Sequence, residues 1–387
     1  MENPDFKRGT KVIIHLKAEC RDFSRAYEIG KIIKKYSNFI SYTIKLNGEI
    51  VNNIQAIWYR ERKDISAEDY QTFYEAINNN TKLPYKYMIH FQSEVPLEIR
   101  SILYIPSNNS EKFGRTEEES IGINLYSKRI LIKPSCRELL PPFLRFVKGV
   151  VDCSDLPLSI SRENYQDSSL IFKLKMLVTK RILKKLEDEI RVDSENYDKW
   201  YDDFGQYLKE GLLTDNDHRQ TLMKLQRFKL NLGSTSKRIS IDDYVAKMLP
   251  NQKKIYFLVV PNDSNIEGNI FLESYRDEKL PVLICNNPVD EMIFQQIRTY
   301  NEFTFLNLEN ENDDFLDAIK KNSPSSVSKI PDNDVTAFTL WLKNELQPYV
   351  EKVTLSKRLK DSPLIVASEM SANMKGFLSI MSQEKVI

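Results

Sequence analysis

Three short, continuous apolar runs constrain the fold of this chain more than any other feature. They are 254–260, 282–285 and 303–306, and helical segments separate them. Apolar runs of this length are typical of strands that are buried on both faces of a parallel sheet. Consecutive parallel strands need long crossover connections, which the helical segments supply. This part of the chain is therefore predicted to form a small α/β layered unit.

The region before these runs predicts a second and larger layered unit. Four segments have the composition and spacing of strands, and helical runs lie among them. These segments are 85–91, 99–105, 121–126 and 129–132. From Ile171 to Ile190 the apolar residues recur at helical spacing, which predicts a long helix over one face of the sheet. A further helical segment is predicted over 197–230. The predicted fold class is α/β of the mixed α+β kind.

The two ends of the chain have simpler patterns. The first part predicts a strand over 9–16, a helix over 23–36 and an alternating strand over 40–46. Asn47-Gly48 is a strong hairpin signal, with 51–58 as the return strand.

The last part begins with a polar, Ser- and Pro-rich linker over 320–333. A helix through Trp341, strands near 350–359 and 364–367 and a last helix are predicted beyond it.

Charge and cysteine content narrow the class of protein. Of the 387 residues, 56 are Lys or Arg and 55 are Asp or Glu, so no bulk charge favours nucleic acid or anionic lipid. The four cysteines, Cys20, Cys136, Cys153 and Cys285, have neither zinc-site nor disulfide-framework spacing, which indicates a reducing compartment. No stretch has the roughly 20 apolar residues that a membrane span needs. We expect neither a nucleic-acid nor a membrane partner, and no bound metal.

A cation stands where the long helix is expected to begin. Ser161 is a candidate N-cap, so Arg162 lies in the first turn and opposes the positive end of the helix dipole, while Gln166 shares its face. Such a cation suggests an anionic ligand, because a guanidinium offers a charged planar fork to phosphate oxygens. The plain alternative is an ion pair with Glu163 or Asp167.

The run 146–163 reads Phe-Val-Lys-Gly-Val-Val-Asp-Cys-Ser-Asp-Leu-Pro-Leu-Ser-Ile-Ser-Arg-Glu. It resembles the middle domain of the heat-shock protein 90 chaperones, with Cys153 and Ser159 in place of the usual Ser and Asn. The resemblance implies that Arg162 and Gln166 are catalytic and that Arg162 contacts the terminal phosphate of ATP. That nucleotide, with Mg, would be held by the preceding domain of an intact ATPase. This chain has no phosphate-binding glycine loop, so no nucleotide is expected to bind it alone.

The resemblance covers nearly the whole chain. The segments 9–17, 96–106, 204–211 and 242–256 follow the family order, and the short join over 46–58 is most similar to the mitochondrial member of that family. A mitochondrial matrix location is therefore expected, with the cytoplasm or another organelle as alternatives.

The family's architecture gives a division of the chain into five parts. The large and the small part are both expected to be αβα layers, and a helical connector joins them. The parts are 1–54, the tail of an ATP-binding domain; 55–210, the large middle part; 211–319, the connector and small part; 320–333, a linker; and 334–387, a truncated α+β carboxy-terminal domain. The helices that build the family's homodimer are missing, so the chain alone is expected to be a monomer.

Client binding by this family requires exposed and adaptable apolar surface. Methionine suits partners of varied shape, and five residues of the last predicted helix, Met370, Met374, Phe377, Leu378 and Met381, fall on one face. A buried core stripe is the commoner meaning of such spacing. The candidate client-binding residues are Trp58, Glu291, Met292, Gln295, Met370, Met374, Phe377 and Met381.

The predicted function is therefore that of an ATP-dependent chaperone fragment that contacts unfolded clients and its own ATP-binding domain. Two alternatives stay open. One is a protein-interaction scaffold without a nucleotide cycle. The other is a small-molecule enzyme at the sheet of 250–310, which lacks a convergent polar set. Hydrolytic chemistry is disfavoured because His15, His90 and His218 are isolated in the sequence.

Overall fold

The computed structural model divides the chain into two compact units, residues 1–185 and 186–387, and each is described by itself. The structure describes residues 9–52, 55–78, 82–109, 122–156, 168–232, 237–260, 266, 268–309, 331–347, 349–355, 359 and 362–365.

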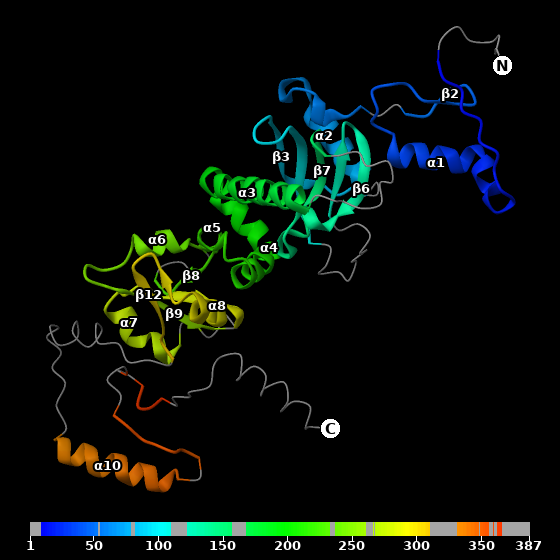
Figure 1. Ribbon diagram of the computed structural model, residues 1–387. Coiled ribbons are helices and arrows are strands. Elements are labelled where there is room, and N and C mark those ends of the chain that lie inside the picture. The colour runs from blue at the N-terminus through cyan, green and yellow to red at the C-terminus, as the bar shows by residue number, and fades with distance from the viewer. Residues whose placement is uncertain are drawn as a thin grey trace. The chain divides into compact units, whose positions relative to one another are not determined.

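A five-stranded sheet in the order β3-β4-β7-β5-β6 forms the centre of the described part of the first unit (Figure 1). Its strands are β3 (Tyr85–Ser93), β4 (Ile99–Pro106), β5 (Ile123–Ser127), β6 (Ile130–Cys136) and β7 (Lys148–Cys153). The pair β5–β7 is parallel and the other three pairs are antiparallel. The four predicted strands are confirmed. The middle strand, β7, was not predicted from the sequence.

Helices cover both faces of this sheet. The helix α2 (Ala67–Ile77) begins at a capping box, in which the amides and side chains of Ser66 and Asp69 bond reciprocally at 3.1 Å. On the face of the sheet that α2 covers, the hydroxyl of Tyr70 in α2 forms a hydrogen bond with Nδ1 of His90 in β3. The next residue of β3, Phe91, points to the other face. There the guanidinium of Arg181 in α3 (Ser168–Val192) lies 5.4 Å from the Phe91 ring centroid. The predicted long helix over one face is confirmed.

One position of β7 must be glycine, because its backbone conformation would direct a Cβ atom at β4. Gly149 has a φ of +151°, and a Cβ atom there would lie 2.3 Å from the carbonyl oxygen of Ile102. No side chain fits at that distance. The register of β7 against β4 therefore depends on the absence of a side chain at this position.

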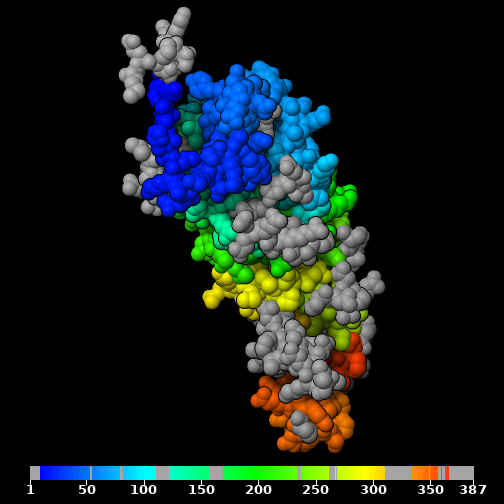
Figure 2. Space-filling model, turned by 90° about the vertical axis from the view of Figure 1, so that its right-hand side faces the viewer, coloured from blue at the N-terminus to red at the C-terminus, as the bar shows by residue number. Residues whose placement is uncertain are grey.

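The segment before the sheet differs in three places from its prediction. The helix α1 (Ala26–Tyr36) and a short hairpin of β1 (Lys45–Leu46) and β2 (Glu49–Ile50) are present as expected. The strand predicted over 40–46 is wrong for 40–44, since only β1 forms a strand there. The strand over 9–16 is wrong, because no described strand pairs with it, and Ile14 is 74% exposed. The return strand over 51–58 is also wrong. The chain turns into a 3₁₀ helix at Ile57–Tyr59, which directs Trp58 into the core. Figure 2 shows the surface of this segment in blue, beside residues 55–78.

The second unit contains the predicted parallel sheet. In its described part the strand order is β11-β12-β9-β10-β8. The strands are β8 (Lys229–Leu230), β9 (Lys254–Val259), β10 (Leu283–Cys285), β11 (Thr299–Tyr300) and β12 (Phe303–Asn307). The three apolar runs form β9, β10 and β12, and β9 is parallel to both neighbours. The edge strands β8 and β11 are antiparallel additions.

Several helices complete the described residues of this unit. The predicted helical segment 197–230 contains α4 (Ser194–Thr214) and α5 (Arg219–Lys224), and the prediction is wrong at its end, where 229–230 form the strand β8. The others are α6 (Ile241–Val245), α7 (Glu273–Asp277), α8 (Val289–Ile297) and α10 (Asp332–Glu345). Among the residues that the structure describes, 3₁₀ helices lie at Ala18–Ser24, Ile57–Tyr59, Arg62–Asp64, Arg137–Leu139, Pro142–Leu144 and Ile270–Leu272.

The predictions beyond residue 319 have mixed outcomes. The helix through Trp341 is confirmed as α10. The strand predicted near 350–359 is wrong for 350–355, which form no ladder with any described strand. Most of the predicted linker, 320–330, lies outside the described residues, as does the last helix.

Candidate functional site

Arg162 and Gln166, the predicted phosphate-contacting pair, lie outside the described residues. The structure does describe the two elements that bracket them, β7 and α3. Just beyond β7, the amide of Ser154 donates to the carbonyl of Glu98 at 3.1 Å, and the amide of Glu98 donates to Asp155 Oδ2 at 2.8 Å. The chain that enters the 157–167 segment is therefore fixed to the start of β4.

The helix that follows this segment is anchored by a buried stripe. Leu170, Leu174, Val178 and Ile182 recur every four residues, and the last three are fully buried. Side chains at this spacing share one face of a helix. Both ends of the segment that carries Arg162 and Gln166 are thus attached to packed structure.

Trp58 is fully buried and belongs to the core of the first unit. Its Nε1 donates to Asp152 Oδ2 at 3.1 Å, and its indole lies 5.3 Å from the Tyr126 ring and 4.8 Å from the Phe39 ring. The backbone amide of Arg129 donates to the same carboxylate oxygen at 2.8 Å. We call Trp58, Asp152 and Arg129 the indole–carboxylate node. Its position matches the core alternative for Trp58 and leaves its client-binding role untested.

Cationic side chains surround Tyr59 beside this node. The guanidinium carbons of Arg129 and Arg100 lie 4.0 and 4.3 Å from the centroid of its ring. Burial, and then the charge of Asp152, raise the pKa of Tyr59 to about 12, although Arg100 opposes the rise. The phenol is therefore neutral at physiological pH. It acts here as a platform for the two arginines.

The four client-binding candidates of the last helix predicted from the sequence, Met370, Met374, Phe377 and Met381, lie outside the described residues. The other candidates of this unit are on α8. Met292 is 48% exposed and Gln295 is exposed. Glu291 is buried, and its Oε1 accepts hydrogen bonds from Asn307 at 3.1 Å and Gln295 at 3.3 Å. The carboxylate of Glu291 thus ties α8 to β12, while Met292 faces solvent.

A second buried polar pair, which the sequence analysis missed, holds α8 from another side. Lys209 Nζ of α4 lies 2.8 Å from Asp290 Oδ1, and both side chains are nearly buried, with 12% and 3% exposed. Burial raises the pKa of Asp290, and the charge of Lys209 opposes this rise. The one local signal was a Lys among the apolar positions of the α4 segment. Its partner, 81 residues away, had no signal.

The described residues give no support to a metal or membrane site. They contain no cluster of three His, Cys, Asp or Glu side chains that could hold a metal ion. No helix in the described part of the chain has both the length and the apolar character that crossing a membrane requires.

Comparison with known proteins connects most of the chain, including the segment 157–167, with one family. The model of the Hsp90 protein family matches residues 46–385. Chaperone protein HtpG of Desulfitobacterium hafniense is 36% identical over 385 residues, which are 99% of this chain and 62% of that protein. The mitochondrial TNF receptor-associated protein 1 homolog of Dictyostelium discoideum is 35% identical, over 98% of this chain and 53% of its own length. The mitochondrial heat shock protein 75 kDa of Rattus norvegicus is 32% identical, over 94% and 52%.

The chain spans between 52% and 62% of the length of these three relatives. The match to the family model extends over both units, and it includes the run 146–163 on which the sequence resemblance depends. That resemblance is confirmed, and the chain belongs to the Hsp90 protein family.

Proposed function

We propose that this chain is the middle part of an ATP-dependent chaperone, in which Arg162 binds the terminal phosphate of ATP held by an amino-terminal domain. The single observation that carries the proposal is the family match over 46–385, which includes Arg162 and Gln166. The attachment of both flanks of 157–167 to β4 and to the core gives further support, because a phosphate-binding side chain must be held in place to act.

The chemistry of the two side chains fits a phosphate group. Arg162 presents a permanently charged planar fork, and Gln166 adds neutral amide donors. When bound, ATP with Mg would supply the phosphoryl group that water attacks. The contribution of Arg162 would be to offset negative charge on the phosphate oxygens, and that of Gln166 would be to orient a neighbouring group by hydrogen bonding.

Replacing Arg162 tests the proposal. The chain is joined in cis to an ATP-binding domain of the same family, and ATP turnover is measured. The joined protein is expected to hydrolyse ATP slowly, and Arg162→Ala to lower the rate by roughly 10²-fold, as loss of a charge-stabilising donor does. Arg162→Lys should retain part of the rate, since it keeps the charge but loses the fork.

Lys173→Ala provides the matched control, because Lys173 is an exposed cation on α3. It should leave turnover unchanged. If Arg162→Ala turned over ATP as fast as the unchanged joined protein, with the same thermal transition, the nucleotide-independent scaffold would be the better description.

The proposed client surface is the exposed part of α8, with Met292 and Gln295, together with the Met-rich segment 370–381. Met292 supports it because an exposed, flexible thioether adapts to partners of varied shape. The hydrogen bond of Glu291 and the ion pair of Asp290 fix α8 in place, which supports the proposal further. A helix that is already fixed loses little conformational entropy when its exposed side chain binds a partner.

Met292→Glu should weaken binding of an unfolded model protein by about fivefold, because a charge replaces an apolar contact. Binding is measured by fluorescence anisotropy of the labelled unfolded protein. Val192→Glu, at a residue that is 79% exposed at the end of α3, is the control and should bind normally. Equal binding by all three proteins would remove α8 from the client surface.

The partners of the parent protein are part of the same proposal. They are unfolded or partly folded clients, its own ATP-binding domain and a second copy in a homodimer. A mitochondrial location is supported by the names of the two mitochondrial relatives, while the HtpG relatives are bacterial and leave the cytoplasm as the alternative.

A further inference from the structure

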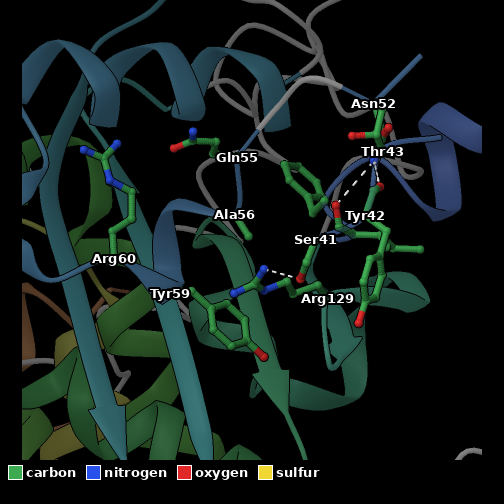
Figure 3. Close-up of a pocket in the computed structure, with 11 residues that line it drawn as sticks. Ser41, Tyr42, Thr43, Asn52, Gln55, Ala56, Tyr59, Arg60 and Arg129 are labelled. Atoms are coloured by element: carbon green, nitrogen blue, oxygen red, sulfur yellow. Dashed lines mark hydrogen bonds between the residues drawn. The ribbon is translucent and has the colours of Figure 1, made fainter. Parts of the chain in front are cut away.

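A pocket of about 390 Å³ lies beside the indole–carboxylate node (Figure 3). One side is formed by residues of 39–60, the segment that contains the β1–β2 hairpin and is called the hairpin segment below, and the other by the turn between β5 and β6. This volume is within the range of small-molecule sites. Its lining includes three aromatic residues, two arginines and no acidic residue. The pocket is thus suited by charge to an anion and by its walls to a flat apolar group.

Arg129 is placed in this pocket by an unusual backbone. It follows Lys128 in the two-residue turn between β5 and β6, and both residues have positive φ, at 49° and 67°. This is the hairpin geometry that ordinarily selects Asn and Gly. The backbone amide of Arg129 bonds Asp152, which holds the turn in position. The positive φ angles of Lys128 and Arg129 cost energy, and they are maintained at a turn that places the Arg129 side chain in the pocket.

The guanidinium of Arg129 has unused binding capacity. One nitrogen, Nη1, donates to the Ser41 hydroxyl, and the central carbon of the guanidinium lies over the Tyr59 ring (Figure 3). Within the described residues, no carboxylate oxygen lies within 4.0 Å of its nitrogens. The nearby carboxylate of Asp152 accepts from the backbone amide of Arg129 and not from its guanidinium. A guanidinium has five N–H donors, so several are left for a ligand.

Two further polar groups line the same space. Gln55 is exposed, and no hydrogen bond of its amide to another described residue is found. Arg60 is partly engaged, since it bonds the carbonyl of Asp64 and lies 3.8 Å from the exposed carboxylate of Asp69. Asn52 is fully used in holding the hairpin segment, through Ile44 and Tyr42. The free donors therefore belong to Arg129 and Gln55, with Arg60 as a second cation.

We propose that this pocket binds a small organic anion, with its carboxylate or phosphate on Arg129 and its flat body against the aromatic wall. Arg129 suits the charged part of the ligand, because it offers a bidentate fork and is held in place by its contact with the Tyr59 ring. The proposal concerns a different site from the Arg162 segment and does not depend on ATP.

Titration of the chain with three ring compounds tests the proposal. Benzoate and phenyl phosphate carry the charge, and benzamide has the same ring without it. Binding is followed by calorimetry and by methyl NMR of Ile40. With so few atoms, Kd on the order of 1 mM is expected for the two anions, and at least about tenfold weaker binding for benzamide. Equal affinity for benzoate and benzamide would overturn the proposal.

Two neighbouring substitutions separate the pocket from the turn. Arg129→Ala should weaken benzoate at least about tenfold, as expected for loss of a charge-assisted contact. Lys128→Ala removes an equal charge from the same strained turn, but its exposed side chain does not line the pocket, so affinity should stay unchanged. Equal losses from both would assign the effect to net charge or turn geometry and overturn the proposal.

Arg60→Ala is the second variant, in case Arg129→Ala alters the fold. Arg60 is outside the indole–carboxylate node, and its loss should weaken benzoate by about threefold through the remaining electrostatic contribution. If Arg129→Ala failed to fold and Arg60→Ala bound benzoate normally, the anion site would be refuted.

Discussion

Trp58→Ala is expected to lower the free energy of unfolding of the first unit by about 3 to 5 kcal/mol, the usual cost of removing a buried Trp or Phe side chain. The indole is fully buried among Phe39, Phe73 and Tyr126, so its removal leaves a cavity that several fixed rings cannot refill. The variant also removes a donor from the buried Asp152 carboxylate.

Hydrogen exchange with mass spectrometry reports each unit separately. Amides of β4 and β7 should exchange roughly 10²- to 4 × 10³-fold faster, and those of β9 and β12 at their former rates. Trp341→Ala, at a side chain that is 55% exposed on α10, should change stability by no more than about 0.5 kcal/mol. Unchanged exchange in β4 and β7 would show that Trp58 is dispensable for the core.

Trp58→Phe separates the two contributions. It keeps most of the ring volume but loses the indole N–H, so Asp152 Oδ2 retains the Arg129 amide and lacks the Trp58 donor. A cost of about 1 to 3 kcal/mol is expected for a buried acceptor that loses a partner. If Trp58→Phe were neutral, cavity formation alone would explain the alanine result.

Lys209→Met should destabilise the second unit by about 3 to 5 kcal/mol, because it leaves the buried Asp290 carboxylate without its cation. Exchange protection of β9 and β10 gives the measurement. The double variant Lys209→Met with Asp290→Leu should recover most of the loss, since both charges are then gone. Lys31→Met, in an exposed pair with Glu28, is the control and should cost at most about 0.5 kcal/mol.

The pH dependence of Lys209→Met has a definite sign. Burial raises the pKa of Asp290, and removing Lys209 removes the charge that opposes this rise. A carboxyl with a raised folded-state pKa favours folding when it is protonated and loses this contribution as pH increases through that pKa. The deficit of Lys209→Met relative to the unchanged chain should therefore shrink as pH falls from 7 towards 5. A deficit that did not change with pH would show that Asp290 stays ionised or is solvated.

Much of the fold could be predicted because many of its helices and strands have a recognisable pattern of apolar residues within a short stretch of sequence. The strands β9, β10 and β12 are continuous apolar runs, and α3 has a regular buried stripe, so each has a signal within a single window. The middle strand β7 was not assigned, because Gly149 and Asp152 interrupt its apolar pattern. Both residues are explained by contacts with other parts of the chain. Gly149 leaves no room for a Cβ atom beside β4, and Asp152 is a buried hydrogen-bond acceptor for Trp58.

The sites were harder to predict than the elements. Arg162 and Gln166 were found because the run 146–163 resembles a family, and their contacts stay a prediction. Arg129 was missed, because a Lys-Arg pair has none of the usual turn residues and its positive φ comes from tertiary contacts. The Lys209–Asp290 pair was missed because sequence spacing says nothing about partners on different helices.

The close contact at Gly149 has a consequence for how such a chain can change over time. Since a Cβ atom at this position would overlap the Ile102 carbonyl, any other amino acid would have to shift β4 or break its pairing with β7. Residues of the surrounding core can be exchanged for larger or smaller ones, whereas this position can only stay glycine. The strand from which the chain continues towards Arg162 is therefore expected to accept substitutions on its packed faces but none at Gly149.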